Sequence, residues 1–385
     1  MIPLNEPLLT GREKDLLSEC IESGWISSDG PFVEKFERDF ASYIGADYGV
    51  AVCNGTAALE TALFAAGVEK KDEIIMPSFT IISCALAAIR LGAVPVLVDA
   101  EPDTWNMDTK QIEARITPRT KVIMPVHIYG HPVDMEPVID IAKRHNLLVI
   151  EDAAEAHGAE YKKKKCGSIG NIAAFSFYAN KIITTGEGGM VVTSDRTAAE
   201  RAKSYRNLCF QPERRFYHTE LGNNYRMTNL QAAIGVAQME RIEEFIHIKR
   251  RMGEYYQKKL STIKGIKTQM EKPWAKTVYW MYCVELDQSL GINADEMMRR
   301  LGEKGIGTRP FFLGLHEQPA LHKLGLFKNE RYPVTERIAR YGLYLPSGLA
   351  LTEKQLDEVA ASVSEVIAAC QNMIKENKEN IGYGL

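Results

Sequence analysis

The sequence predicts an α/β fold, in which a mostly parallel seven-stranded sheet is flanked by helices and followed by a smaller α+β C-terminal domain. Two observations lead to this prediction. Short apolar runs of strand length recur along the first part of the chain, and helical patterns separate most of them. Such alternation is typical of parallel sheets that are covered on both faces. From residue 228 to about 260 the pattern then stays helical, which marks a change of domain.

The expected elements follow in chain order. The strand-like runs of the first part lie near residues 48–53, 73–76, 94–98, 121–127, 147–151, 173–178 and 190–193. Helical patterns predict helices over residues 56–66, 79–91 and 134–145. In the second part we expect strands at 277–286 and 306–312, and helices at 294–304 and from about 352. We therefore divide the chain into a large domain, residues 1–240, and a small domain, residues 241–385.

The composition is that of a large globular protein, with 385 residues, of which 45% are hydrophobic and 25% charged. A net charge of -3 argues against nucleic-acid binding, and no apolar run approaches the ~20 residues that span a bilayer. Seven cysteines without a Cys-x-x-Cys pair favour reduced thiols, and the N-terminus has no secretion pattern. We expect a cytoplasmic protein with no metal, membrane or nucleic-acid partner. The basic run 162–165 is expected at a solvated hairpin tip.

Lys181 ends an apolar strand-like run and precedes a glycine-rich turn, residues 186–189. Partial desolvation at such a position lowers the pKa of a lysine toward the range where its amine is nucleophilic. Most lysines are solvated surface groups, so the position alone does not assign a catalytic role.

Glu151 and Asp152 end another apolar run, 29 positions before Lys181. Ligands of open α/β sheets sit beyond the carboxyl ends of the strands. A carboxylate there can hold a protonated ring nitrogen, and a lysine on a neighbouring strand can hold an aldehyde. Both are requirements of pyridoxal phosphate. The alternative is that the two acids only cap the turn at 153–157.

A phosphate site is suggested by Asn54-Gly55-Thr56, which follows a strand-like run and precedes a helical pattern. The N–H groups and dipole at a helix start attract anions. The same tripeptide is also an ordinary helix start with Thr56 as N-cap. Together with the lysine and the acid, it predicts a pyridoxal 5'-phosphate site.

The chain resembles the DegT/DnrJ/EryC1/StrS family of nucleotide-sugar aminotransferases, which are fold type I pyridoxal-phosphate enzymes. The segments that carry the resemblance, in order and spacing, are residues 54–59, 77–80, 151–158, 175–181 and 222–228. The resemblance implies transfer of an amino group from L-glutamate to the 4-keto carbon of a nucleotide-linked 4-keto-6-deoxyhexose. We expect a GDP-linked sugar, with a UDP- or dTDP-linked sugar as the alternative. The resemblance also implies a homodimer with shared active sites and a product used for lipopolysaccharide O-antigen.

The resemblance also implies roles for individual residues. Lys181 would hold the cofactor aldehyde and carry protons, and Asp152 would hold the ring nitrogen; these two are the expected catalytic residues. Glu155 would lie near the ring hydroxyl. The residues expected around the phosphate are Gly55, Thr56, Ala57, Ser176 and, from the partner subunit, Asn224. One position departs from the family pattern, because Ile81 stands where an aromatic residue usually stacks on the cofactor ring. Phe79 could share its face of an extended segment.

Four residues are candidates for substrate binding. Arg309 suits a diphosphate but could equally be a surface ion-pair member. His316 could contact the sugar or be a satisfied surface histidine. His127 could face the cofactor or only pack, and Glu187 could contact the sugar or cap its own turn.

Two other classes of protein share the fold. A related pyridoxal-phosphate dehydratase carries histidine where this chain has Lys181, so the lysine argues against dehydration. A non-catalytic regulator would usually carry an added DNA-binding region, and this sequence has no basic extension of that kind.

Overall fold

The central element of the protein is a seven-stranded sheet with the strand order β1-β9-β8-β5-β4-β2-β3. The computed structural model describes residues 1–211 and 213–382, with side chains as far as Glu376. The strands are β1 (Tyr48–Val52), β2 (Glu73–Pro77), β3 (Val94–Val98), β4 (Thr120–Ile123), β5 (Leu148–Asp152), β8 (Ile172–Ser176) and β9 (Gly189–Thr193). Only β9 runs antiparallel to its neighbours. The predicted mostly parallel sheet is confirmed.

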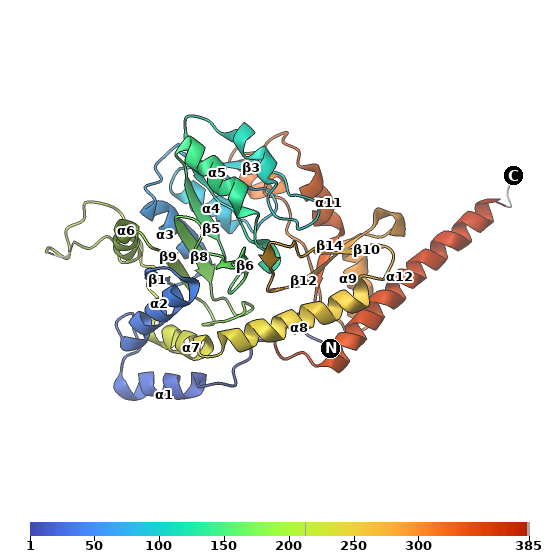
Figure 1. Ribbon diagram of the computed structural model, residues 1–385, viewed down its shortest axis with the longest axis horizontal. Coiled ribbons are helices and arrows are strands. Elements are labelled where there is room, and N and C mark those ends of the chain that lie inside the picture. The colour runs from blue at the N-terminus through green and yellow to red at the C-terminus, as the bar shows by residue number, and fades with distance from the viewer. Residues whose placement is uncertain (212, 383–385) are drawn as a thin grey trace.

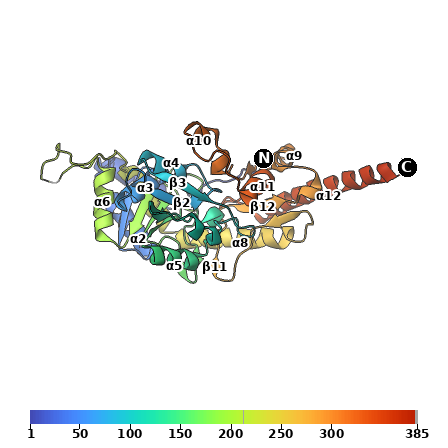
Figure 2. The same cartoon turned by 90° about the horizontal axis from the view of Figure 1, so that it is seen from above.

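Helices cover both faces of this sheet, with α3 and α4 on one side and α5 on the other (Figure 1, Figure 2). Strands such as β2, β8 and β9 are buried along their whole length, which explains their continuous apolar sequences. The helices of this part are α1 (Glu13–Ser23), α2 (Pro31–Ile44), α3 (Gly55–Ala65), α4 (Ser83–Arg90), α5 (Met135–His145), α6 (Arg196–Arg206), α7 (Asn229–Met239) and α8 (Ile242–Leu260). The helical stretch expected from residue 228 is thus two helices.

A second, antiparallel sheet has the order β10-β12-β14-β13. Its strands are β10 (Ile266–Thr268), β12 (Tyr282–Leu286), β13 (Arg309–Pro310) and β14 (Gly342–Leu345). The helices of this part are α9 (Ala294–Glu303), α10 (Pro319–Lys323), α11 (Pro333–Tyr341) and α12 (Glu353–Gly382), the last of which projects from the body in Figure 1. Short 3₁₀ helices are η1 (Thr109–Gln111), η2 (Glu113–Arg115), η3 (Ile128–Gly130), η4 (Gln288–Leu290) and η5 (Leu315–Glu317).

The strand expected at 277–286 is shorter than predicted, because its first residues dock on another part of the chain. The backbone N–H of Val278 and the hydroxyl of Thr277 both donate to the carbonyl oxygen of Gly130, at 3.1 and 3.0 Å. Of the run 277–286, only residues 282–286, which form β12, pair in the second sheet. Thr277 and Val278, just before β12, therefore contact Gly130 of η3.

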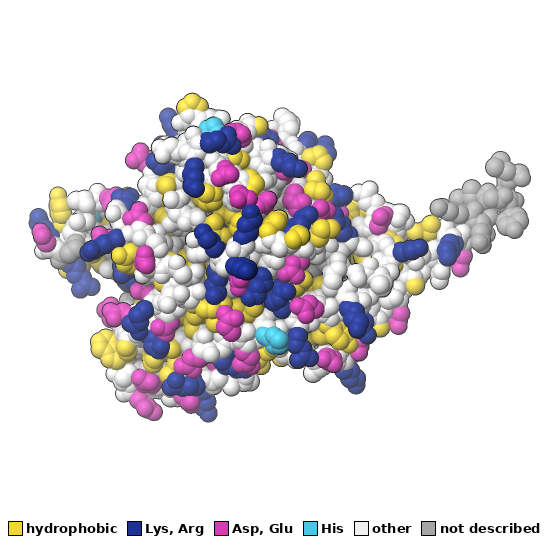
Figure 3. All heavy atoms as spheres, viewed as in Figure 1, with side chains coloured by type: hydrophobic (Ala, Val, Ile, Leu, Met, Phe, Trp, Pro, Cys, Tyr) yellow, Lys and Arg dark blue, Asp and Glu magenta, His cyan; other side chains and the backbone are white. Residues whose placement is uncertain are grey.

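The basic run forms the expected hairpin tip. β6 (Glu160–Tyr161) pairs with β7 (Lys164–Lys165) and with β11 (Ala275–Lys276) in a small third sheet. Lys162 and Lys163 both have left-handed backbone angles, as a two-residue hairpin turn requires. Charges of both signs are interspersed on the face drawn in Figure 3. Among the described helices, none combines the length and the apolar character needed to cross a membrane.

Candidate active site

A cavity of about 770 Å³ lies at the carboxyl edge of the central sheet. β5 ends in Asp152, β8 ends in Ser176, and α3 begins just after β1. The cavity lining contains ten of the residues expected at the site, namely Gly55, Thr56, Ala57, Ile81, Asp152, Glu155, Ser176, Lys181, Glu187 and Arg309. The strand-end argument therefore places residues from distant segments together.

Lys181 is largely buried, with its side chain 10% exposed. Its Nζ lies 3.7 Å from Oε1 of Glu155 and 3.7 Å from the centroid of the Trp280 ring. Burial lowers the pKa of the Lys181 amine, and the nearby carboxylates of Glu155 and Asp152 oppose that shift. The Lys181 amine is thus desolvated, as its position in the sequence predicts.

Asp152 faces the same cavity and is almost fully buried. Its Oδ1 accepts a hydrogen bond from the backbone N–H of Ala154 at 3.1 Å, and the thiol of Cys84 donates to its Oδ2 at 3.2 Å. Burial raises the pKa of the Asp152 carboxyl, and these donors and Lys181 oppose the rise. Because side chains alternate along a strand, the neighbouring Glu151 points away from the cavity.

Glu155 is the second buried acid beside the amine. Its Oε2 accepts a hydrogen bond from the backbone N–H of Tyr129 at 2.7 Å. Burial raises the pKa of the Glu155 carboxyl to about 7, although Lys181 favours the ionised form. Its charge therefore changes near neutral pH.

The start of α3 forms one wall of the cavity. Asn54 is the N-cap, and its side chain accepts from the N–H of Ala57 at 2.8 Å. The N-cap is thus Asn54, and not Thr56 as the alternative interpretation of this tripeptide had it, and the amide of Ala57 is already engaged. The N–H groups of Gly55 and Thr56, in the first helical turn, have no intrahelical acceptor and suit an anion.

A glycine is required at position 55 by a close approach. A Cβ on Gly55 would lie 2.7 Å from Cβ of Ser176. Real Cβ atoms do not approach so closely, so only glycine lets the helix start lie against the end of β8. The hydroxyl of Thr56 lies 2.9 Å from that of Ser83, which places further hydroxyl groups on this wall.

These residues fit pyridoxal phosphate. The buried carboxylate of Asp152 accepts only a backbone N–H and a thiol in the hydrogen bonds that the structure describes, so it can take a protonated ring nitrogen. The helix start suits a phosphate, and Lys181 supplies an amine for an aldehyde. The described residues hold no cluster of three or more His, Cys, Asp or Glu that could bind a metal.

Three predicted site residues lie outside the cavity lining, namely His127, His316 and Asn224. His127 is fully buried; its Nε2 lies 2.9 Å from Oε2 of Glu151, and its Nδ1 lies 3.0 Å from the N–H of Val133. His316 is also buried. Its Nδ1 lies 2.7 Å from the hydroxyl of Ser78 and its Nε2 lies 3.3 Å from Glu336.

Both histidines thus have their ring nitrogens engaged inside the protein. For His127 this agrees with the packing alternative, whereas His316 is satisfied but buried, so the surface position considered for it is wrong. Asn224 is exposed, pairs with Asn207 in an isolated β-bridge, and is not part of the cavity lining, although its neighbour Tyr225 is. Phe79 is fully buried against Tyr129 and Phe311, so it does not share the cavity face of Ile81.

Several lining residues were missed from sequence. Trp280 lies in the run that the sequence predicts as a strand. Cys84, which donates to Asp152 without lining the cavity, carries no motif either. The remaining missed residues of the lining include Ser83, Tyr178, Phe312 and Tyr344.

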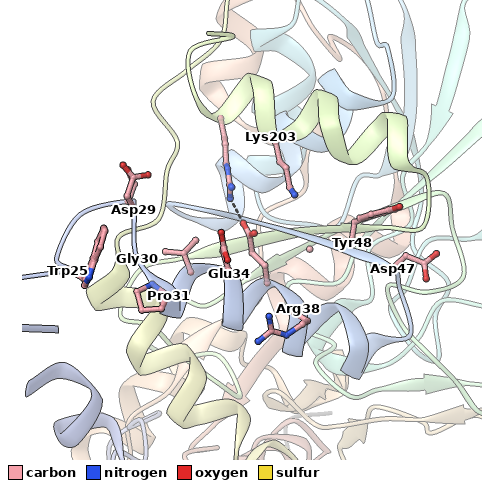
Figure 4. A pocket seen from close by; sticks show the side chains of 14 residues that line it. Trp25, Asp29, Gly30, Pro31, Glu34, Arg38, Asp47, Tyr48 and Lys203 are labelled. Carbon is pink, nitrogen blue, oxygen red and sulfur yellow. Dashed lines mark hydrogen bonds and ion pairs between the residues drawn. The ribbon is translucent and has the colours of Figure 1, made fainter. Parts of the chain in front are cut away.

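A second cavity, of about 630 Å³, lies between α2 and α6. Glu34 and Arg38 of α2 and Lys203 of α6 line it (Figure 4). Arg206 donates to Glu37 and to the carbonyl oxygen of Ala51 at its edge. None of the predicted catalytic or cofactor-binding residues lines it.

The fold is shared with solved aminotransferases. The crystal structure of the aminotransferase TlmJ from Streptoalloteichus hindustanus matches 96% of this chain and 100% of its own, with a TM-score of 0.89 and 30% identity. The sheet, the buried lysine and the cavity thus define a protein of the pyridoxal-phosphate-dependent aminotransferase class.

The family follows from the sequence comparison. The model of the DegT/DnrJ/EryC1/StrS aminotransferase family matches residues 7–364, so the chain belongs to this family. GDP-perosamine synthase of Caulobacter vibrioides is 44% identical over 95% of this chain and 98% of that protein. GDP-perosamine synthase of Escherichia coli O157:H7 is 41% identical over 94% of this chain and 98% of that protein. The resemblance seen in the motifs is confirmed.

Proposed function

We propose that this enzyme transfers an amino group from L-glutamate to the 4-keto carbon of GDP-4-keto-6-deoxy-D-mannose, which gives GDP-perosamine. One observation carries the proposal: the two relatives named GDP-perosamine synthase align with nearly the whole chain, small C-terminal part included. The small part supplies Arg309 to the cavity lining, so the likeness extends over residues expected to meet the sugar.

Lys181 is the proposed proton carrier. When bound, pyridoxal phosphate supplies an aldehyde that bonds to amines and a ring that accepts an electron pair. The amine of Lys181 would hold the aldehyde carbon until the amino donor displaces it. The free amine would then take the proton from the α-carbon of the donor and deliver it within the same cavity. The lowered pKa of this amine supports the role, because the neutral form is the base.

Asp152 would keep the ring nitrogen protonated. A charge-assisted hydrogen bond of this kind contributes roughly 1.5–3 kcal/mol net. The burial of Asp152 supports the role, since a desolvated carboxylate gains most from a cationic partner. Glu155 would lie beside the ring hydroxyl.

The phosphate would lie at the start of α3. Gly55 and Thr56 would donate backbone N–H groups, and the hydroxyls of Thr56 and Ser176 would add hydrogen bonds. Ala57 would serve mainly by fixing the helix start, because Asn54 already accepts its N–H.

We also propose a homodimer in which Asn224 of the partner subunit completes the site. The exposed position of this asparagine supports that role, as does the segment beside it, where Phe216 is 82% and Leu221 is 90% exposed. Large apolar side chains that are exposed close together, as Phe216, Tyr217 and Leu221 are along this segment, commonly mark an interface. Mass photometry at low concentration measures the oligomeric state.

Of the four substrate-binding candidates, Glu187 and Arg309 remain in the proposal because both line the cavity. Arg309 would pair with the diphosphate and Glu187 with a sugar hydroxyl. We further propose that the enzyme is cytoplasmic and that its product is used for lipopolysaccharide O-antigen. We also propose a domain boundary near residue 240, where α7 ends and α8 begins.

Substrate profiling tests the proposed reaction. The purified enzyme, L-glutamate and each of the GDP-, UDP- and dTDP-linked 4-keto-6-deoxysugars are combined, and the aminated product is measured by mass spectrometry. We expect the GDP-linked sugar to have the highest kcat/KM. Amination of only a UDP- or dTDP-linked sugar would contradict the perosamine proposal and leave the family unchanged. Absence of amination with every sugar would favour a regulator.

A further inference from the structure

Trp280 lies against the proposed catalytic amine, although it comes from a distant segment just before β12. The side chain is almost fully buried and lines the cavity. Nζ of Lys181 is 3.7 Å from the centroid of its ring. At this distance an ammonium group is attracted to the face of an indole, and desolvation strengthens the attraction.

The same residue also fixes the backbone beside the lysine. The indole N–H of Trp280 donates to the carbonyl oxygen of Asn180 at 2.8 Å, and Nδ2 of Asn5 donates to that oxygen at 2.7 Å. Asn180 directly precedes Lys181. Trp280 therefore contacts both the amine and the peptide group that begins the lysine residue.

Trp280 is itself held in place. Nζ of the buried Lys249 donates to the carbonyl oxygen of Trp280 at 2.7 Å and also to that of Ser347. The indole ring lies nearly parallel to the ring of Tyr129, at an interplanar angle of 15° and a centroid distance of 6.3 Å. A residue fixed at both its backbone and its ring can impose a position on its neighbour.

Of the two carboxylates near the Lys181 amine, Glu155 and Asp152, Glu155 is within 3.7 Å of Nζ and cannot give a constant attraction. Burial raises the pKa of its carboxyl to about 7, so its charge varies near neutral pH. The face of an indole ring carries no titrating group, and its attraction for a cation is independent of pH. The attraction between the Lys181 amine and Glu155 therefore depends on pH, whereas that between the amine and Trp280 does not.

We propose that Trp280 is a positioning residue for Lys181, which holds the amine over its ring and favours the protonated state of the lysine nitrogen. The inference rests on the proposed role of Lys181. It predicts that loss of the ring makes the lysine nitrogen easier to deprotonate and reduces turnover more than substrate binding.

The test compares Trp280→Leu, which removes the ring and the N–H, with Trp280→Phe, which keeps a smaller ring without the N–H. Trp274→Leu is the matched control, because Trp274 packs against His131 and Tyr161 and does not line the cavity. The readout is the pH at which the visible absorbance of the lysine-bound cofactor changes, together with kcat and KM for L-glutamate.

We expect Trp280→Leu to lower the midpoint of this spectral titration by roughly one pH unit, Trp280→Phe to lower it by less, and Trp274→Leu to leave it unchanged. For Trp280→Leu we expect kcat to fall by about tenfold, with a smaller change in KM. A midpoint for Trp280→Leu equal to that of the wild type would overturn the proposal.

The folding of each variant is checked by circular dichroism. Should Trp280→Leu fail to fold, Trp280→Phe decides, and an unchanged titration there contradicts the proposal, because a phenyl face holds a cation more weakly than an indole. Failure of the proposed role of Lys181 gives a different result. In that case the wild-type protein itself would show no lysine-bound absorbance and no amination.

Discussion

Lys181 and Lys249 are both withdrawn from solvent, and their surroundings differ. The amine of Lys181 lines a cavity, beside the carboxylates of Glu155 and Asp152. The amine of Lys249 donates to the carbonyl oxygens of Trp280 and Ser347 and does not line that cavity. Burial lowers the pKa of both amines, for Lys249 to about 7. A lowered pKa therefore does not by itself identify a catalytic lysine.

The difference lies in what each amine can reach. The amine of Lys181 faces a cavity of about 770 Å³, and the charged groups near it are the side-chain carboxylates of Glu155 and Asp152. Lys249 is 2% exposed, and its acceptors are backbone groups that cannot move away without disturbing the fold. We therefore interpret Lys181 as a reactive group and Lys249 as a structural one.

The strongest test of this comparison is Lys181→Ala. The variant loses both the covalent anchor of the cofactor and the proton carrier, so we expect turnover to fall by roughly 10⁴-fold or more. The visible absorbance of the lysine-bound cofactor should be absent. Lys181→Arg, which keeps a positive charge, should be equally inactive, and activity near the wild-type level in either variant would refute the assignment of Lys181.

Lys249→Met tests the other side of the comparison. The substitution removes the donor from two buried carbonyl groups, so we expect the free energy of unfolding to fall by about 2 kcal/mol. Lys258→Met, an exposed position on the same helix, is the control and should change stability by less than about 0.5 kcal/mol. Urea unfolding followed by circular dichroism measures both.

The pH dependence of the stability difference between wild type and Lys249→Met tests whether the buried amine is neutral. Between about pH 7 and pH 10 the unfolded chain keeps the lysine proton that the folded chain has released. The unfolded state then binds more protons, so this lysine makes wild-type stability rise with pH, by at most ~1.4 kcal/mol per pH unit. The stability difference between wild type and Lys249→Met should grow over this interval. A constant difference would mean that Lys249 stays charged when folded.

The smallest expected effect concerns the acid that shares the cavity with Lys181. The thiol of Cys84 donates to Asp152, which favours the ionised carboxyl. Cys84→Ala removes this donor, and we expect pyridoxal phosphate to bind about 2- to 10-fold more weakly, measured by absorbance titration. Cys84→Ser keeps a donor and should bind nearly as well as the wild type. Equal weakening in both variants would assign the effect to packing.

Much of the fold could be predicted because the sheet is buried. Strands such as β8 and β9 have continuous apolar sequences, and their positions agree with the prediction to within about two residues. α6 was missed because its buried face consists mainly of alanines, which give a weak apolar signal. α2 was missed although Phe32, Phe36 and Phe40 recur at helical spacing, so that signal was available.

The residues of the candidate site also fall into those that the sequence could locate and those that it could not. Lys181 and Asp152 could be located because Asp152 ends β5 and Lys181 follows the end of β8, and the ends of parallel strands share one edge. Trp280 and Cys84 approach them through tertiary packing, which leaves no local pattern. For His127 and His316 the sequence left a choice, and their buried hydrogen-bond partners favour packing.

The antiparallel pairing of β9 has a consequence for how the lysine reaches its place. β8 and β9 are joined directly, with Ser176 opposite Gly189, so the segment that bears Lys181 closes over a short stretch of chain. The parallel neighbours need long crossovers, and closing a longer loop loses more chain entropy. During folding the lysine segment should thus acquire its native pairing before the acid on β5 has met it, which a pulse-labelling hydrogen-exchange experiment would detect as earlier protection in β8 and β9.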